Sequence, residues 1–444
     1  MSHAYSYSWA LNPCWSRVWS KRDEILEYIH DVARNQLQIH NHTSFNTQVV
    51  TANFENGIWT LHLKDLKTGA TFEINHTFLM SATGQLNIPF IPKTLDETKS
   101  NFTNGPQFHS ARWNKTVDLS NKRVACIGTG ASAIQFVPEI APKVKELLVF
   151  QRSPGWIIAK HDYPYSTFIK GLFKAFPLLL RLYRYYFFAW MDSVYLNVIP
   201  NSAPQPSKIN SLITKFVASE MSRHLNYNQE LCEKLIPKDT LGCKRLLLSD
   251  EWLSVFHREN VKLITDPAQE ILKDGIRCHS GKEVHDIDVI IYATGFDTNA
   301  FLKTLEIKVN NQTDLHRDIW KDIPRAYRGI TVADVPNFTM CYAANTNVNH
   351  SSIISIIECE VEHFGQLVTN VVENKKKQFL VKKKAYLDFN KEEQDRLKTT
   401  AFNGNCTSWY KKNKNQIIVN NYHGTMFSFW QSTRVVNWSD YEFS

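Results

Sequence analysis

One stretch, residues 122–152, constrains the fold more strongly than any other part of the chain. A short apolar run at 123–127 leads directly into the sequence Gly-Thr-Gly-Ala-Ser-Ala at 128–133. A segment with apolar residues at helical spacing follows, and a second apolar run at 147–150 ends the unit. The order strand, glycine turn, helix, strand is that of a parallel crossover. The sequence therefore predicts an α/β protein with a Rossmann-like domain.

The small residues of the turn each have a physical role in such a domain. Gly128 permits a tight turn, and Gly130 allows backbone N–H groups to approach a pyrophosphate at the helix N-terminus. Ala133 is small enough for helix and strand to pack closely. The pattern predicts a dinucleotide site, and the alternative is an ordinary turn after a buried strand.

The end of the second strand indicates which dinucleotide is bound. An NAD site places an acidic residue there, whereas this chain has Gln151 and Arg152. A cation at that point suits a 2′-phosphate, so NADP is favoured. The alternative is a solvated arginine at a strand end.

Length, charge and cysteine spacing bound the class of protein. A chain of 444 residues is expected to hold two or three domains. The net charge of +8 is spread out, apart from lysine runs at 375–377 and 382–384 that we expect to be solvated rather than bound to nucleic acid. The eight cysteines include no C-x-x-C pair, so we expect neither a disulfide framework nor a thiol redox centre. Without an N-terminal targeting signal, the expected location is intracellular and cytoplasmic.

Two strand endings repeat each other, namely Ser-Ala-Thr-Gly at 81–84 and Tyr-Ala-Thr-Gly at 292–295. The second ending has a matching glycine turn upstream, at 128–133. The first has none, because no G-x-G lies between residues 1 and 82. If the repeat is real, one crossover is expected before Met1. The alternative is that both endings are ordinary turns.

An aromatic, helical stretch occupies residues 168–198. Leu, Phe, Tyr and Trp alternate there with basic residues, and Pro177 interrupts the run. No clean apolar span of about twenty residues exists, so a buried helical insertion is favoured. The alternative is association with a membrane surface through a helix that lies on it, because basic and aromatic residues suit a lipid interface.

Six motifs resemble those of Baeyer–Villiger monooxygenases, within the flavin-containing monooxygenase group. The stretch 105–113 is similar to the family fingerprint F-x-G-x-x-x-H-x-x-x-W, although Phe102 lies one residue too far from Gly105 and Asn114 replaces the usual Pro or Asp. The remaining matches occur in family order: GTGASAIQ at 128–135, FQRSP at 150–154, CKR at 243–245, ATGFD at 293–297 and CTSWY at 406–410.

The resemblance implies two dinucleotide-binding domains, with the FAD domain discontinuous around the NADP domain. The FAD domain would comprise residues 1–113 and 329–444. The NADP domain would comprise 114–328, with the helical insertion at about 164–236. The family's first FAD turn and an active-site aspartate have no counterpart here, so the chain resembles an N-terminally truncated member that lacks the first crossover.

The resemblance also implies which residues form the site. Arg245 would face the flavin as the catalytic cation, and Tyr5, Val49 and Ile353 would contact FAD. His109 is expected to be a structural residue between the domains rather than a proton carrier. The positions that match NADP contacts are Gly128, Thr129, Gly130, Ala131, Ser132, Ala133, Gln135, Arg152, Ser153 and Lys244.

The implied activity is an NADPH- and O2-dependent monooxygenation. Through a C4a-peroxyflavin, one oxygen atom would be inserted next to a ketone or added to a soft nitrogen or sulfur centre of an amine or sulfide. The flavin carries this chemistry and the protein places the reactants. The alternative is a catalytically impaired remnant that binds NADP but lacks a complete FAD site.

Overall fold

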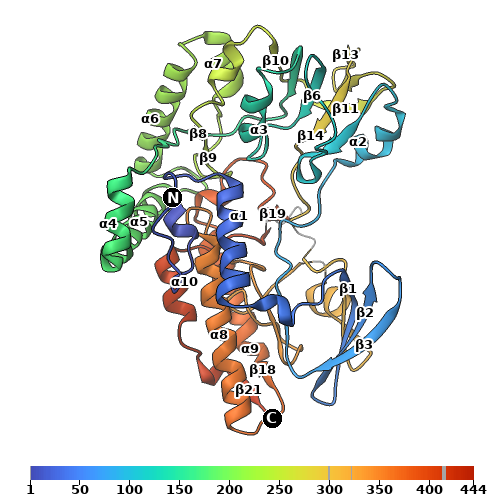
Figure 1. Ribbon diagram of the computed structural model, residues 1–444, viewed down its shortest axis with the longest axis vertical. Coiled ribbons are helices and arrows are strands. Elements are labelled where there is room, and N and C mark those ends of the chain that lie inside the picture. Colours follow the sequence, from blue (N-terminus) through green and yellow to red (C-terminus); the bar gives the residue numbers. More distant parts are fainter. Residues whose placement is uncertain (1, 299–300, 322, 413–416) are drawn as a thin grey trace.

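The computed structural model describes residues 2–298, 301–321, 323–412 and 417–444, which form two α/β domains (Figure 1). We name them the parallel-sheet domain (residues 91–294, upper part of Figure 1) and the meander domain (residues 2–87 and 298–444). The predicted α/β class is therefore confirmed.

The parallel-sheet domain is built on five strands in the order β10-β7-β6-β14-β5, and every neighbouring pair is parallel. The crossover predicted at 122–152 is present as β6, α3 and β7. Side chains of β7 and β14 are buried almost without exception, as expected of parallel strands covered on both faces. Its elements are α2 (Lys93–Thr98), β5 (Gln107–His109), β6 (Arg123–Ile127), α3 (Ala133–Ile140), β7 (Glu146–Phe150), β8 (Ile157–Ile158), β9 (Leu247–Leu248), β10 (Val261–Ile264), β11 (Ala268–Ile271), β12 (Ile276–Cys278), β13 (Glu283–Val284) and β14 (Val289–Tyr292).

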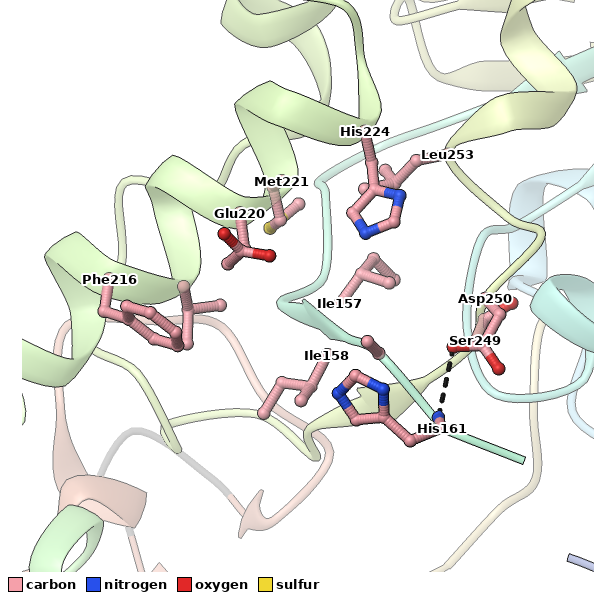
Figure 2. Close-up of a pocket in the computed structure, with 12 residues that line it drawn as sticks. Ile157, Ile158, His161, Phe216, Glu220, Met221, His224, Ser249, Asp250 and Leu253 are labelled. Carbon is pink, nitrogen blue, oxygen red and sulfur yellow. Dashed lines mark hydrogen bonds between the residues drawn. The ribbon is translucent and has the colours of Figure 1, made fainter. Parts of the chain in front are cut away.

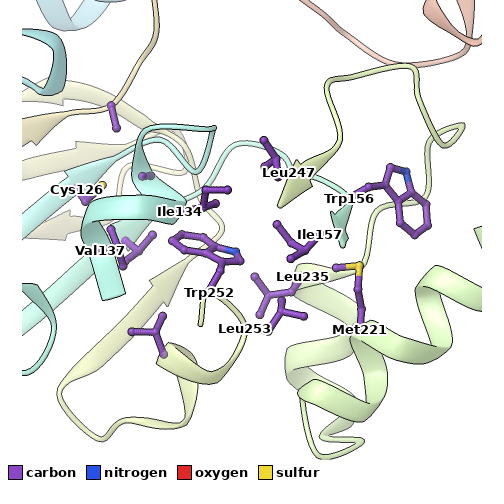
Figure 3. Packing of buried hydrophobic residues seen from close by; sticks show 14 of the residues in the cluster. Cys126, Ile134, Val137, Trp156, Ile157, Met221, Leu235, Leu247, Trp252 and Leu253 are labelled. Carbon is purple, nitrogen blue, oxygen red and sulfur yellow. The ribbon is translucent and has the colours of Figure 1, made fainter. Parts of the chain in front are cut away.

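The core of this domain joins the sheet to helix α3 (Figure 3). Cys126 of β6 packs with Ile134 and Val137 of α3, and Trp252 and Leu253 extend the cluster. All five are at most 6% exposed. This packing fixes the end of β6, and with it the glycine turn.

The meander domain contains a second five-stranded sheet, in the order β16-β15-β1-β2-β3. The strands predicted from residue 47 onward are present, and β1 also pairs in parallel with β15. Strands β4 and β17 form a separate two-stranded parallel pair. The elements are α1 (Arg22–Asp31), β1 (Thr47–Glu55), β2 (Ile58–Asp65), β3 (Thr71–His76), β4 (Leu79–Ser81), β15 (Glu306–Val309), β16 (Thr313–Asp314), β17 (Phe338–Met340), α8 (Ile353–Glu373), β18 (Phe379–Val381), α9 (Lys383–Leu397), β19 (Lys411–Lys412), β20 (Ile417–Ile418), α10 (Met426–Thr433) and β21 (Tyr441–Phe443).

The chain passes from one sheet to the other at residues 88–90 and 295–297, and the domain boundaries at 113 and 328 stay a prediction. The two crossing segments pair with each other: Phe90 N donates to Gly295 O at 2.9 Å, and Asp297 N donates to Ile88 O at 2.9 Å. Beyond these two segments, β5 joins β14 of the parallel sheet and β15 joins β1 of the meander.

His109 lies buried beside this crossing. Its Nδ1 accepts a hydrogen bond from Ala111 N at 3.1 Å, and burial lowers the pKa of its imidazole. A neutral, buried ring of this kind fits the structural role expected for it.

The predicted insertion is helical, with α4 (Thr167–Ala175), α5 (Pro177–Val198), α6 (Lys208–His224) and α7 (Gln229–Leu235) between β8 and β9. The expectation that it is buried is wrong for α5, which packs on one face only. Leu180, Tyr195 and Val198 are at most 3% exposed, whereas Leu178 and Tyr186 are 68% and 65% exposed. Within the described ranges, no helix combines the length and apolarity needed to cross a bilayer.

The expectation that the cysteines form no disulfide is also wrong. Cys243 and Cys406 are bonded to each other across 163 residues of sequence. Spacing could not reveal the pair, because only folding brings the loop before β9 against the segment after α9. The bond ties the Lys244–Arg245 loop to the C-terminal part of the chain.

Helix α8 carries a fully buried carboxyl group. Glu360 Oε2 accepts a hydrogen bond from Tyr342 N at 2.9 Å, while its Oε1 has no hydrogen-bond partner among the described residues. Burial raises the pKa of Glu360 well above its usual value. The protonated side chain therefore anchors the loop that follows β17.

We predict that Gly128→Ala destabilises the protein. Gly128 has a φ of +111°, and a Cβ there would lie 2.4 Å from Ala293 O. Backbone strain of this kind costs about 1–3 kcal/mol. The matched control is Gly130→Ala, because a Cβ at Gly130 meets nothing within 4 Å. Urea unfolding followed by tryptophan fluorescence should show a lower midpoint for the first variant only. Equal midpoints would contradict this role for Gly128.

We predict that Glu360→Gln becomes increasingly stabilising as the pH rises. At pH values between the unfolded pKa of 4.5 and the raised folded pKa, the Glu360 carboxyl group is protonated in the folded chain and ionised in the unfolded chain. The stability of the parent protein therefore falls as the pH rises. The free energy of unfolding falls by at most about 1.4 kcal/mol per pH unit through this group. The glutamine oxygen can still accept from Tyr342 N and does not titrate.

Urea midpoints measured at several pH values from 5 upward would test this, because burial raises the pKa of the folded side chain above its usual value. Glu362→Gln, an exposed position on the same helix, is the control. A constant difference between Glu360→Gln and the parent across this range would refute the buried carboxyl as the cause.

Candidate functional site

The glycine turn leaves a strip of accessible backbone at the end of β6. Gly128 N donates to Phe150 O at 3.0 Å, which ties the turn to β7. Residues 128–132 remain partly or fully exposed before α3 begins at Ala133. An anion can therefore approach backbone N–H groups at the N-terminus of α3.

The predicted side chains around this turn lie at one edge of the sheet. Gln135 is exposed, and its Nε2 donates to Ala131 O at 2.6 Å. Arg152 and Ser153 follow β7, the neighbour of β6, and both are exposed. Arg152 forms no ion pair with any residue in the described part of the chain. Its guanidinium is thus available to a ligand at the turn.

A second loop reaches Ser153 from the far side of the helical insertion. Lys244 Nζ lies 3.3 Å from Ser153 Oγ and 2.7 Å from Asp239 Oδ2. The pairing of β8 with β9 sets this approach, since Ile157 is opposite Leu247. The structure therefore brings Ser153 and Lys244 into contact. Before the structure, only the match to family motifs had assigned both residues to one site.

Arg245, the next residue, lies within electrostatic reach of two buried tyrosines. Burial raises the pKa of Tyr342 to about 12 and also raises that of Tyr410, and the charge of Arg245 opposes both shifts. The phenols are neutral and hydrogen-bonded: Tyr410 Oη donates to Asn349 Oδ1 at 2.9 Å, and Tyr342 Oη donates to Asn347 Oδ1 at 3.3 Å. Arg245 is exposed and has no carboxylate partner among the described residues.

Two of the three predicted FAD contacts lie in this region. Tyr5 ends a short 3-10 helix that packs against α8, and it lies within electrostatic reach of Tyr342. Ile353 is the first residue of α8. Val49 lies elsewhere: it is in β1, opposite Leu63, and packs on the core of the meander domain.

Buried polar groups without partners gather around the same loop, and sequence matching missed them. Gln85 follows β4, is 3% exposed and lies close to the side chain of Tyr342, yet no hydrogen bond of good geometry reaches either of its amide atoms from the described residues. The same holds for the side-chain atoms Asn349 Nδ2, Ser351 Oγ and Ser352 Oγ and for Glu360 Oε1. Each unmet buried group costs about 1–3 kcal/mol, so such a cluster is expected where a polar ligand sits. The only sequence signal was the Asn- and Ser-rich run at 345–352.

A small cavity elsewhere contains none of the predicted site residues. It measures about 100 Å³ and lies between α6 and the segments around β8 and β9 (Figure 2). Phe216, Met221 and Leu253 line it, and His161 N donates to Asp250 Oδ1 nearby. In the described ranges, no group of three or more His, Cys, Asp or Glu residues is placed to hold a metal ion.

Comparison with known proteins identifies the family. Residues 16–333 match the family described as flavin-binding monooxygenase-like. The FAD-binding monooxygenase ktnD of Aspergillus niger is 33% identical over 99% of this chain and 72% of its own length. A Baeyer–Villiger monooxygenase of Pseudomonas aeruginosa is 32% identical over 92% of this chain and 75% of its own length.

Solved structures agree with this fold. OTEMO, in complex with FAD and NADP, superposes with a TM-score of 0.84 at 23% identity and covers all of this chain and 90% of its own. A closed cyclohexanone monooxygenase gives 0.85 at 21% identity, over all of this chain and 89% of its own. Since the family match spans most of the sequence and both relatives extend it, this chain belongs to the flavin-binding monooxygenase-like family of enzymes.

Proposed function

We propose that this protein is an FAD- and NADPH-dependent monooxygenase that transfers one oxygen atom from O2 to a small organic substrate. The observation that carries the proposal is the meeting of both domains at the Arg245 loop. A lone cation there faces neutral tyrosines and several buried polar groups without partners. The relatives named above support the same activity.

The residues around the loop fit a flavin. Gln85, Asn349 and Ser351 present buried donors and acceptors that lack protein partners among the described residues, as a polar ring edge requires. Tyr5 and Ile353 would flank it, and Val49 would contact a more distant part of FAD. When bound, FAD supplies hydride acceptance from NADPH and the activation of O2.

The glycine turn fits the second dinucleotide. Backbone N–H groups at 128–133 would hold the pyrophosphate of NADP, with Gln135 beside them. Arg152 would bind the 2′-phosphate as an unpaired guanidinium, which matches phosphate geometry well. Ser153 and Lys244 would bind the same ligand from the other side, because the two side chains are already in contact.

Arg245 would stabilise negative charge on oxygen during transfer to the substrate. A fixed cation stabilises such charge electrostatically, and Arg245 lies within electrostatic reach of the Tyr342 and Tyr410 rings. The neighbouring disulfide from Cys243 to Cys406 holds the loop in place. Asp239 forms its ion pair with Lys244 and does not neutralise the charge of Arg245.

A ketone is the favoured substrate, because a relative at 32% identity is named a Baeyer–Villiger monooxygenase. An amine or sulfide is the other substrate class. The remnant that binds NADP alone has less support, since unpaired polar groups of the meander domain still surround the Arg245 loop. A visible absorption spectrum of the purified protein separates a monooxygenase, which would show bound flavin, from a remnant that binds NADP alone.

We predict that Arg152→Ala lowers the preference for NADPH over NADH. A charged hydrogen bond to the 2′-phosphate contributes roughly 1.5–3 kcal/mol, or about ten- to a hundredfold in affinity. Titration of both coenzymes measures the ratio. Lys145→Ala is the control, because Lys145 is exposed at the opposite end of β7. An unchanged ratio in Arg152→Ala would show that another group binds the phosphate.

We predict that Arg245→Ala in the flavin-loaded protein abolishes oxygenation but not NADPH binding. Loss of one charge-stabilising donor costs about 10²–10³ in rate. Product formed per NADPH consumed should fall, while the NADPH dissociation constant stays within about twofold, given the typical ±0.5 kcal/mol effect of a surface change. Arg245→Lys, which keeps the charge, should retain more product than Arg245→Ala. Full product formation by Arg245→Ala would rule out this role.

A further inference from the structure

Helices α4 and α5 present a large apolar surface that no other part of the described chain covers. Its side chains are between 49% and 75% exposed. We call it the aromatic face, and it comprises Phe168, Phe176, Leu178, Leu182, Tyr185, Tyr186 and Trp190.

The aromatic face follows from the residue spacing of α5. Leu178, Leu182, Tyr186 and Trp190 recur every four residues, so they line one side of the helix. The opposite side carries the buried residues, which include Leu180 and Arg184. A surface helix normally has a polar outer side. Packing within this chain does not explain why α5 is apolar on both sides.

Helix α6 continues this surface. Ile209, Leu212 and Phe216 lie on one side of it at spacings of three and four residues, and they are 53%, 69% and 66% exposed. Helices α5 and α6 pack against each other, and α4, α5 and α6 lie along one side of the molecule (Figure 1). Exposed apolar patches of this kind mark interaction surfaces.

The charges of this region are almost all positive. Between residues 163 and 219 the only acidic residue is Asp192, which is buried and lies 2.7 Å from His350 Nε2. Five cations of the region form no ion pair with any described residue: Lys170, Lys174, Arg181, Lys208 and Lys215. Unpaired cations next to aromatic and aliphatic side chains are typical of helices that lie in a lipid interface.

We infer that the aromatic face docks on the surface of an anionic lipid bilayer. The apolar side chains would enter the boundary between headgroups and acyl chains, and the five cations would contact lipid phosphates and carboxylates. A second copy of this chain fits less well, because a symmetric contact would oppose the same uncompensated cations.

The docked bilayer would lie directly behind the candidate site. On its inner side α5 contacts the loop and helix that follow Asn349: Asp192 bonds His350, and Arg184 Nη2 donates to Ser355 Oγ at 3.2 Å. Only this helix separates the aromatic face from those residues. The inference concerns binding to lipid and stands whether or not the proposed oxygenation is correct.

Vesicle flotation tests the inference with the full chain. Phosphatidylcholine vesicles with phosphatidylserine should carry the protein, and vesicles of phosphatidylcholine alone should carry much less. Leu182→Ser combined with Trp190→Ser should lower partitioning by about tenfold or more, because two apolar side chains no longer enter the bilayer. Lys174→Gln combined with Arg181→Gln should lower it about 30-fold on anionic vesicles, at about 1 kcal/mol per cation.

Matched controls lie outside the aromatic face. Leu66 and Trp438 are 59% and 43% exposed, close to Leu182 and Trp190 at 56% and 49%. Leu66→Ser combined with Trp438→Ser should leave partitioning unchanged, and so should Lys67→Gln combined with Lys145→Gln. The inference is overturned if the parent protein fails to float with anionic vesicles, or if controls and test variants lose binding equally. It is also overturned if the parent protein does not bind vesicles and instead sediments as a dimer, which Leu182→Ser combined with Trp190→Ser dissociates.

Discussion

The burial of the parallel sheet on both faces is the constraint from which the positions of the site residues follow. Parallel strands can be joined only through crossovers, so the carboxyl ends of β6, β7 and β14 meet at one edge. Gly128, Arg152 and Ala293 follow these ends and are thereby neighbours, as the close approach of Gly128 to Ala293 O shows. A buried sheet is also rigid, which suits a site that must position two reactants.

The meander domain contributes to the site in a different manner, through polar groups in a water-poor region. Tyr342 donates both its backbone N–H, to Glu360, and its hydroxyl, to Asn347. These bonds fix the loop after β17, while Gln85 and Ser351 nearby lack partners among the described residues. Such an arrangement is costly in the absence of a ligand, and it becomes favourable when a polar cofactor fills the space.

The helical insertion links this site to the surface of the molecule. The inner side of α5 bonds residues next to the site through Asp192 and Arg184, whereas its outer side is apolar and flanked by unpaired cations. Both sides are encoded in one helix of 22 residues. The periodic pattern shows that two sides are apolar, but it does not show which one the rest of the chain covers.

The sequence by itself determined the features that depend on local interactions. The glycine turn, the crossover around it, the strands from residue 47 and the helical nature of 167–235 are present, because backbone conformation and apolar periodicity act over a few residues. The family motifs also assigned Lys244 and Ser153 to the same NADP site, whereas their contact depends on the distant pairing of β8 with β9.

Only the tertiary structure decided the features that depend on the path of the chain. The crossing at 88–90 and 295–297, the bond between Cys243 and Cys406, and the tyrosines beside Arg245 join segments far apart in sequence. The same is true of the exposed side of α5. Whether a residue is covered, paired or left free is set by which distant segment packs against it, and no local pattern carries that information.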